Sequence, residues 1–599
     1  MNQLLEYPFD GQKIKRKRKA LLRELSEQPG LIEKKIAVLG GSTTHDIKEI
    51  LELFLLNYGI RPTFFESEYA QYWQDAMFGN EELEALQPDI IYIHTSLRNI
   101  TAFPEPQMSA EEVDRLLEQQ FDHFRVMWER LREKYHCILI QNNFEYPFYR
   151  LMGNQDAWNV HGRTNFVTRL NQKFYEYAQK QAGEQGQFYI NDINYLASDY
   201  GLQKWSNPLY WHEYKYALCL DAIPTLAYSV ANIIKSIYGK NKKALALDLD
   251  NTLWGGIVGD DGVDNLELGM ETAFGQVYTE FQQYLKELNK RGILLNVISK
   301  NEKENAEAGL KHPQMILKPE DFISIKANWE PKSLNLKQMA AELSLLPESF
   351  VFADDNPAER EIIRQQVPGT AVPELDKVEN YITAIDRAGY FETTVISADD
   401  FKRVSMYREN AQRASLEQSF ENYEDYLLSL QMKGEIRPFA PVYMSRIAQL
   451  TNKSNQFNLT TRRCTQEEIE QFARDERYIT LYGRLEDRFG DNGVVSVVIG
   501  EIEGQELQIR LWLMSCRVLK RDMEFAMMDG LVRRSLEKGI CRINGYYYPT
   551  AKNAMVREFY KTQGMAKVSE DEDGSTVWSM EIGPDYQNKN HVISVEESK

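Results

Sequence analysis

Two carboxylates separated by one residue follow a short apolar run near the middle of the sequence. Asp248 and Asp250 come directly after Ala-Leu-Ala-Leu and before Asn-Thr252. One carboxylate can attack a phosphorus atom, and a second one nearby can protonate the leaving oxygen and later activate water. This spacing is therefore typical of a nucleophile paired with an acid in phosphoryl transfer.

The other groups that this chemistry needs follow in order along the chain. It requires a hydroxyl to hold phosphoryl oxygens, a lysine to offset charge, and Mg²⁺ to shield the nucleophile from an anionic substrate. Ser299 ends the next apolar run, Lys332 comes after it, and Asp354 and Asp355 close a third run. Because strands alternate with helical sequence, we expect these groups to meet at the carboxyl edge of a parallel sheet. A solvated acidic loop is the alternative, but it does not require all four motifs.

These motifs resemble the four motifs of the haloacid dehalogenase phosphatase superfamily. The resemblance implies that Asp248 is the nucleophile and Asp250 the general acid/base. It implies a phosphoryl-binding set of Thr252, Ser299 and Lys332. It also implies a Mg²⁺ site formed by Asp248, Asp355 and the Asp250 carbonyl, with Asp354 as a supporting carboxylate. The chain between the motifs leaves no room for a large cap, so we predict an open site with a minimal cap.

The last third of the sequence resembles the Gcn-type N-acetyltransferase (GNAT) fold. The resemblance rests on Leu511–Leu519 and on the stretch from Tyr547 to Gly564, which includes Tyr560. Active acyl-CoA users of that fold place glycines where backbone amides bind pyrophosphate at a helix N-terminus. Lys520 and Asp522 stand at those positions here. We therefore do not expect CoA to bind in the standard manner.

Together with residues 451–463 and 487–493, this combination resembles the FkbH-like family over residues 244–581. The resemblance implies transfer of an acyl group, such as glyceryl from 1,3-bisphosphoglycerate, to an acyl carrier protein through a cysteine. Cys516 stands at the matching position, and the neighbouring Arg517, Lys520 and Arg521 would favour a reactive thiolate. The alternative is a buried small residue at a strand end. Asn492 could donate to an acyl oxyanion, although turn formation explains it nearly as well.

The first third resembles the SGNH hydrolases in part. Ser42 follows the first apolar run, Asn142 follows a later one, and His212 lies near the end of this region. Leu209 stands where those enzymes carry an acidic residue that orients the histidine. We therefore favour a docking or cap role for this domain over hydrolysis.

Composition limits the classes of protein that this chain can belong to. It has 599 residues, 43% of them hydrophobic, and 70 basic against 89 acidic residues give a net charge of −19. Such a charge disfavours nucleic-acid binding. The uncharged run Ala222–Ile234 is too short to span a membrane, and the N-terminus lacks an apolar signal segment, so we expect a cytoplasmic protein. The five cysteines form no CxxC pair, which argues against a disulfide framework or a structural zinc site.

These patterns predict an α/β multidomain chain, with strand–helix alternation in the first two domains and a mainly antiparallel α+β third domain. The predicted boundaries are an SGNH hydrolase-like (flavodoxin-like) α/β domain at 1–240, a Rossmannoid haloacid dehalogenase-like domain at 241–395, a helical linker at 396–430, a GNAT-like domain at 431–585, and a frayed tail at 586–599.

The sequence leaves two functional hypotheses open. The first is a Mg²⁺-dependent phosphatase coupled to acyl transfer onto a carrier protein. The second is a phosphatase acting on a phosphosugar or other phosphorylated intermediate of surface-polysaccharide or secondary-metabolite synthesis, with flanking domains that only bind substrate or partners. Both take a small phosphorylated substrate, and a Cys516→Ser variant distinguishes them.

Overall fold

The computed structural model describes residues 2–184, 187–417, 419–550 and 552–596. Contacts within the chain divide it into two compact units, Met1–Ile237 with Glu392–Val395, and Tyr238–Phe391 with Ile396–Lys599. The second unit contains two separate sheets. The domain boundaries expected from the sequence stay predictions beside this division. No helix in the described ranges is long and apolar enough to cross a membrane.

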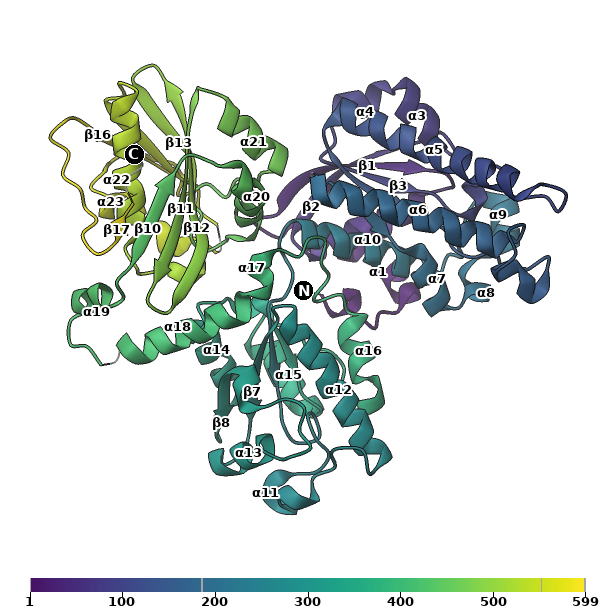
Figure 1. Ribbon diagram of the computed structural model, residues 1–599, viewed down its shortest axis with the longest axis horizontal. Helices are drawn as coiled ribbons and strands as arrows, with labels where there is room; N and C mark the ends of the chain where they lie inside the picture. Colours follow the sequence, from purple (N-terminus) through teal and green to yellow (C-terminus); the bar gives the residue numbers. More distant parts are fainter. Residues whose placement is uncertain (1, 185–186, 418, 551, 597–599) are drawn as a thin grey trace. The chain divides into compact units, whose positions relative to one another are not determined.

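The first unit is built on a five-stranded parallel sheet in the order β2-β1-β3-β4-β5. This is the flavodoxin-like order, in which ligand sites lie at the carboxyl edge. Its strands are β1 (Ile32–Gly40), β2 (Ile60–Glu66), β3 (Ile90–His94), β4 (Ile138–Asn142) and β5 (Phe188–Asn191). Strands β1, β2 and β3 are labelled in Figure 1.

Helices cover both faces of this sheet, as continuous apolar strands require. Helices α3 to α6 share one apolar cluster with alternate residues of β1, β3 and β4, while α2 and α10 contact β2 and β5. The helices are α1 (Gly11–Ser26), α2 (His45–Asn57), α3 (Tyr72–Phe78), α4 (Glu81–Leu86), α5 (Ala110–Tyr135), α6 (Arg163–Glu184), α7 (Ile193–Tyr200), α8 (Leu202–Trp205), α9 (Pro208–Tyr214) and α10 (Ile223–Ile237).

The second unit begins with a four-stranded parallel sheet in the order β8-β7-β6-β9. Between β6 and β7 the described chain forms the short helix α11, a 3-10 helix at Val263–Asn265 and the long helix α12, so no separate cap domain is inserted there. The elements are β6 (Ala244–Leu247), α11 (Val258–Asp261), α12 (Ala273–Lys290), β7 (Leu294–Ser299), α13 (Lys303–Leu310), β8 (Phe322–Ala327), α14 (Lys332–Glu342), β9 (Phe350–Ala353), α15 (Pro357–Gln366) and α16 (Tyr381–Asp386).

Three helices lead from this sheet to the next one: α17 (Ala398–Phe401), α18 (Arg403–Glu417) and α19 (Tyr423–Ser429). Helix α18 belongs to the core of the four-stranded sheet, because Val404 and Tyr407 are buried in the same apolar cluster as Leu336 and Phe352. The stretch expected as a linker is therefore helical, and part of it is packed.

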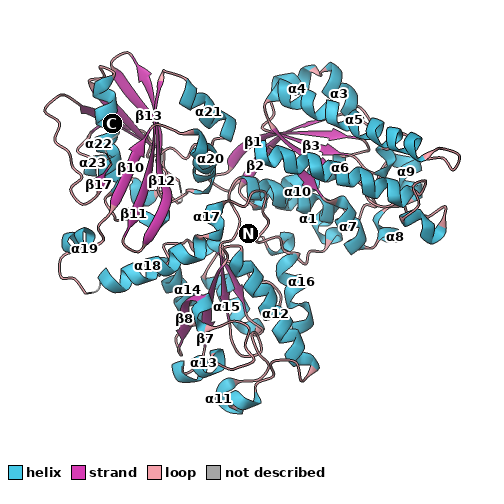
Figure 2. Cartoon of the chain, viewed as in Figure 1, coloured by secondary structure: helices cyan, strands magenta, loops and turns pink. Residues whose placement is uncertain are grey.

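The second sheet has eight strands. Figure 2 shows its strands β10 to β13 as magenta ribbons. Strand β13 pairs antiparallel with β12 and parallel with β14, so the sheet is mixed. Its strands are β10 (Lys433–Arg437), β11 (Tyr478–Asp487), β12 (Gly490–Glu503), β13 (Glu506–Met514), β14 (Arg542–Tyr547), β15 (Ala566–Glu570), β16 (Thr576–Glu581) and β17 (Ser594–Val595). Its helices are α20 (Met444–Lys453), α21 (Gln466–Arg474), α22 (Met523–Glu537) and α23 (Phe559–Thr562).

The chain's last described segment differs from the frayed tail expected from its polar composition. Val592 and Ile593 are buried in the sheet's apolar core. Strand β17 pairs with β10, and the Ser594 amide donates to the Met432 carbonyl at 2.9 Å. Two apolar residues and an open strand edge were enough to order this segment.

Candidate active site

The four sequence motifs meet at one edge of the four-stranded sheet. Asp248 follows β6, Ser299 ends β7, and Asp354 and Asp355 follow β9. Lys332 is the first residue of α14, which follows β8. Because all four strands are parallel, these carboxyl ends lie side by side. The expected convergence at one sheet edge is thus what the fold produces.

Lys332 is buried between two carboxylates. Its Nζ lies 2.9 Å from Asp248 Oδ2 and 2.6 Å from Asp354 Oδ2. Burial opposes the charge on Lys332, but the two carboxylates raise its pKa overall. Burial and the charge of Asp248 raise the pKa of Asp354 to about 6, against the opposing effect of Lys332. This arrangement holds a fixed positive charge beside the Asp248 carboxylate, where an incoming phosphoryl group would gain negative charge.

Asp355 and Asp248 present carboxylate oxygens to the same space. Oxygens of Asp248, Asp354 and Asp355 lie within 4.8 Å of one another. Asp248 Oδ1 is buried and has no hydrogen-bond partner among the described residues. The Thr252 hydroxyl makes two contacts with Asp355. It donates to the side-chain Oδ1 at 3.4 Å and accepts from the backbone amide at 3.3 Å. An unpaired carboxylate oxygen in an all-oxygen cluster fits a hard divalent cation such as Mg²⁺.

Asp250 is fixed by three donors. Its Oδ1 accepts from the Trp254 indole at 2.9 Å and from the Val258 amide at 3.0 Å. Its Oδ2 accepts from the Asn301 side chain at 2.7 Å, and the same Asn301 nitrogen lies 3.2 Å from Ser299 Oγ. Asn301 therefore links the acid/base candidate to the hydroxyl candidate. The sequence prediction missed Asn301, although its position two residues after Ser299 is a signal that could have found it.

Cys516 does not face this edge. It begins a short 3-10 helix after β13 and lines a cavity of about 100 Å³. Lys243, which precedes β6, and Ser349, which precedes β9, line the same cavity. These residues mark the amino edge of the four-stranded sheet, opposite the carboxyl edge that holds Asp248. Cys516 is partly exposed, so the expectation of a fully buried small residue does not describe it.

Two features near the end of β13 bear on the expectation that CoA does not bind in the standard manner. At the start of α22, Lys520 and Asp522 have left-handed backbone conformations with φ of 63° and 58°. Burial and the nearby Asp522 raise the pKa of Glu524, in the first turn, to about 7. Arg521 points away into a buried cluster, 3.1 Å from Asp487. The helix start therefore offers acidic side chains to a pyrophosphate.

The second feature is a segment of the chain's own backbone between β13 and β14. Those strands pair only from Glu506 to Ile509 on β13. Beyond that point residues 457–459 fill the gap: the Leu459 amide donates to Trp512 at 3.0 Å, and the Tyr548 amide donates to Leu459 at 2.9 Å. The strand edges there are already paired, so they cannot bind the amides of an extended pantetheine arm in the manner of an added strand.

Two further candidates of this region lie in the interior. Asn492 is 1% exposed, and its Oδ1 lies 3.5 Å from Arg521, so it supports that buried cluster. Tyr560 is fully buried, packs against Trp512 and Phe559, and its hydroxyl has no partner among the described residues. Burial raises the pKa of Tyr560 strongly. Neither side chain faces the cavity beside Cys516.

The three N-terminal candidates do not form a triad. Asn142 is buried and hydrogen-bonds the His94 ring at 3.0 Å and the Tyr92 hydroxyl at 3.1 Å. Ser42 is 2% exposed, and its hydroxyl has no partner among the described residues. His212 is exposed on α9, and no hydrogen bond in the described ranges joins it to Ser42. Without an acidic residue to orient it, His212 stays at the surface.

Comparisons with known proteins agree with the fold. Residues 35–235 match the family model for the FkbH N-terminal domain. The N-terminal part of protein BF1531 from Bacteroides fragilis, described as containing a phosphatase domain complexed with Mg, is 29% identical, with a TM-score of 0.58, over 63% of this chain and 99% of that one. A search of curated proteins found no match.

Two acetyltransferases resemble a smaller share of the chain. The ribosomal-protein-S18-alanine N-acetyltransferase from Escherichia coli is 12% identical over 26% of this chain and 99% of that one, with a TM-score of 0.20. A GNAT-family acetyltransferase from Streptococcus pneumoniae is 15% identical over 25% and 100%, with a TM-score of 0.21. The predicted α/β multidomain class is confirmed, because two of the three sheets are parallel and the third is mixed.

Proposed function

We propose that this chain is a Mg²⁺-dependent phosphohydrolase that works through a phosphorylated Asp248. The observation that supports it most is Lys332, buried within 2.9 Å of Asp248 and 2.6 Å of Asp354 at the carboxyl edge of the sheet. The similar Bacteroides fragilis protein is described as containing a phosphatase domain complexed with Mg, which agrees with this proposal.

The reaction has two displacements at phosphorus. An Asp248 oxygen attacks, the bond to the leaving oxygen breaks, and Asp250 gives that oxygen a proton. Asp250 then takes a proton from water, the water oxygen attacks phosphorus, and the bond to Asp248 breaks. Phosphate is released and both carboxylates return to their starting states. Ser299, Thr252 and Lys332 hold the phosphoryl oxygens.

Asp248, Asp355 and the Asp250 carbonyl would hold Mg²⁺, with Asp354 fixing Lys332. When bound, the cation offsets negative charge so that an anionic carboxylate can approach an anionic phosphoryl group. The unpaired Asp248 Oδ1 is the structural reason to place it there.

A broad panel of phosphoesters tests this proposal. We expect the full chain to release phosphate with Mg²⁺ and an Asp248→Asn variant to release none above background. Lys326→Met is a matched control, because Lys326 is a partly buried lysine that pairs with Glu342, 2.8 Å away, and contacts none of the motif carboxylates. Failure of every substrate, with the same background in the Asp248→Asn variant, would contradict it.

A second activity, acyl transfer to a carrier protein through Cys516, is favoured by the FkbH match and by the cavity that this thiol lines. Cys516 lies beside the amino edge of the four-stranded sheet and Asp248 at its carboxyl edge. Phosphate removal and acyl transfer would therefore occur at separate places, and the acyl group must move from one edge to the other. Cys516→Ser should abolish the acyl-carrier product and retain phosphate release. If both are retained, the chain is a phosphatase alone, acting on a phosphosugar or similar intermediate.

The partners that follow are a small phosphorylated substrate and, for the second activity, an acyl carrier protein, both met in the cytoplasm. CoA is not the expected acyl donor, because Asp522, Glu524 and the paired strand edges beside residues 457–459 occupy the places it would use.

A further inference from the structure

The cavity beside Cys516 is rich in positive charge, although the chain as a whole carries −19. Five basic side chains line it against three acidic ones. The basic side chains are Lys243, Arg403, Arg446, Lys453 and Arg517.

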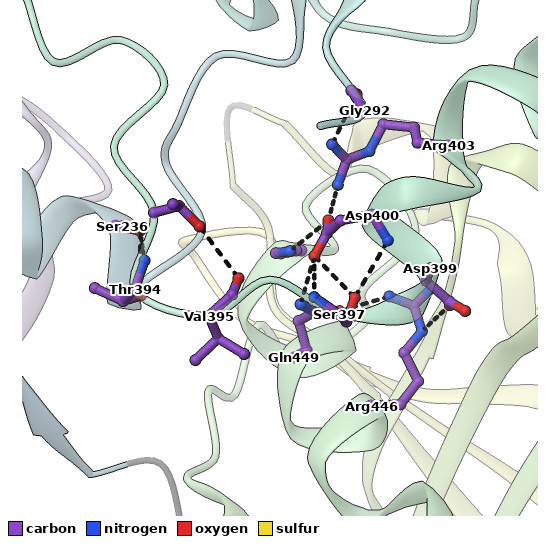
Figure 3. Close-up of polar contacts among 12 residues, drawn as sticks. Ser236, Gly292, Thr394, Val395, Ser397, Asp399, Asp400, Arg403, Arg446 and Gln449 are labelled. Atoms are coloured by element: carbon purple, nitrogen blue, oxygen red, sulfur yellow. Dashed lines mark hydrogen bonds and ion pairs between the residues drawn. The ribbon is translucent and has the colours of Figure 1, made fainter. Parts of the chain in front are cut away.

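Most of these cations have a protein partner. Asp400 lies 3.3 Å from Lys453 and also pairs with Arg403, whose other nitrogen donates to the Gly292 carbonyl at 3.0 Å (Figure 3). Arg446 lies 2.8 Å from Asp399. These contacts fix the walls of the cavity, since Asp399 and Asp400 each pair with side chains from two different elements.

Lys243 has no such partner. Its Nζ makes no hydrogen bond or ion pair with any described residue, while its backbone amide is fixed by the Ser349 carbonyl at 2.8 Å. Burial lowers the pKa of Lys243, and the charges of Arg403 and Arg517 lower it further, whereas Cys516 and Glu348 oppose this effect. Burial also lowers the pKa of Lys453 to about 8. The basic side chains that line the cavity therefore outnumber the carboxylates that could neutralise them.

The cavity has the size and the reactive neighbour of a ligand site. The cavity volume of about 100 Å³ exceeds that needed by a single water several-fold, so a tetrahedral anion fits. The Cys516 thiol opens onto this space beside Lys243 and the Tyr407 hydroxyl.

We propose that this cavity is a second anion site, which binds a phosphate group beside Cys516, with Lys243 as its principal cation. The group could come from free phosphate or from the phosphorylated end of a pantetheine arm. In both cases an anionic phosphate group would pair with Lys243 and would lie over the thiol. The site lies at the amino edge of the sheet, so it does not depend on the proposed phosphatase.

Alkylation of Cys516 by iodoacetamide, read by peptide mass spectrometry on the full chain, tests this proposal. Inorganic phosphate, compared with chloride at equal ionic strength, should slow alkylation of Cys516 several-fold. The exposed Cys541 lies outside the cavity and gives an internal reference whose rate should not change. Pantetheine 4′-phosphate should protect at lower concentration than inorganic phosphate if the arm supplies the group, and pantetheine, which lacks the phosphate, should not protect.

Lys243→Met should abolish the protection. Lys290→Met is the matched control, because Lys290 is exposed and pairs with Glu287 at the surface. Should Lys243→Met fail to fold, Lys453→Met is the second variant. It should fold, since Asp400 keeps Arg403 as its partner, and it should weaken the protection because one cation of the cavity is lost. Asp248→Asn should keep it, which separates this site from the phosphatase.

Three results would overturn the proposal: no protection by phosphate or by pantetheine 4′-phosphate, equal slowing at Cys516 and Cys541, or full protection retained in a folded Lys243→Met variant. Protection lost in Asp248→Asn would also overturn it, because phosphate would then be acting through the carboxyl edge.

Discussion

Lys243 and Asp248 lie at opposite ends of strand β6, one at the amino edge of the four-stranded sheet and the other at the carboxyl edge. Five residue steps of an extended strand separate them by about 16 Å. Lys243 lines the cavity of Cys516, whereas Asp248 pairs with Lys332. One short strand thus separates the thiol from the phosphoryl chemistry, and any acyl group handled by both must leave one edge to reach the other.

Replacing Lys332 with methionine removes the charge between Asp248 and Asp354. We expect phosphate release to fall by at least about 100-fold, because a fixed charge at the reacting group is lost. Two buried carboxylates would also repel each other, so the melting temperature should fall. A steady-state assay measures the rate of phosphate release, and thermal unfolding measures the melting temperature. A Lys332→Met variant with near-normal turnover would contradict this role, and Lys326→Met should change neither quantity.

Mg²⁺ should stabilise the second unit even without substrate. A ligand that binds only the folded state raises the melting temperature by mass action. We expect an upward shift with Mg²⁺ in the wild-type chain and little shift in Asp355→Asn, measured by differential scanning fluorimetry with EDTA as reference. Equal shifts in both proteins would place the cation elsewhere.

Asn301 acts as a positioning residue for Asp250. Asn301→Leu removes the 2.7 Å bond to Asp250 Oδ2. We expect kcat to fall roughly tenfold to a hundredfold, as is typical when a hydrogen bond that orients a catalytic group is lost, with KM and the melting temperature little changed. A lower kcat that comes with a much lower melting temperature would indicate a merely structural effect, and an unchanged kcat would contradict the positioning role.

Glu145 should make the first unit less stable as pH rises. Burial raises its pKa from 4.5 to about 7, and its Oε2 accepts from the Leu97 amide at 3.1 Å. Between those values the folded state binds a proton that the unfolded state has released, so the free energy of unfolding falls with rising pH. Above about 7 this contribution is constant.

Glu145→Gln keeps an oxygen acceptor and removes the ionisation. In urea unfolding below and above this pH window, the variant should lose less stability than the wild type on going to the higher pH. An identical loss in both proteins would exclude Glu145 as the cause.

The sequence predicted the phosphoryl edge because alternating strands and helices bring all carboxyl ends together. Each of Asp248, Ser299 and Asp355 stands at such an end, so no side-chain geometry was needed. Trp254 and Asn301 were missed because they reach Asp250 through loop folds that hydrophobic periodicity does not describe. Edge strand β8 was missed because its residues are only partly buried.

The position of Cys516 could not be predicted in the same way. Its cavity depends on α18, where Tyr407 packs into the core of one sheet and contacts the thiol that follows a strand of the other. Contacts between elements that are far apart in the sequence produce no motif of fixed spacing, so the sequence alone could not predict them. For His212 the order of the motifs suggested a pair with Ser42, but no hydrogen bond among the described residues joins the two side chains.

The most direct test of the central claim is mass spectrometry of the peptide that contains Asp248, after acid quench of the full chain turning over a phosphorylated substrate with Mg²⁺. The account predicts a phosphoryl adduct on Asp248 that disappears with hydroxylamine treatment and is absent in Asp248→Asn. Phosphate release at the wild-type rate by Asp248→Asn, or an adduct on another residue, would contradict it.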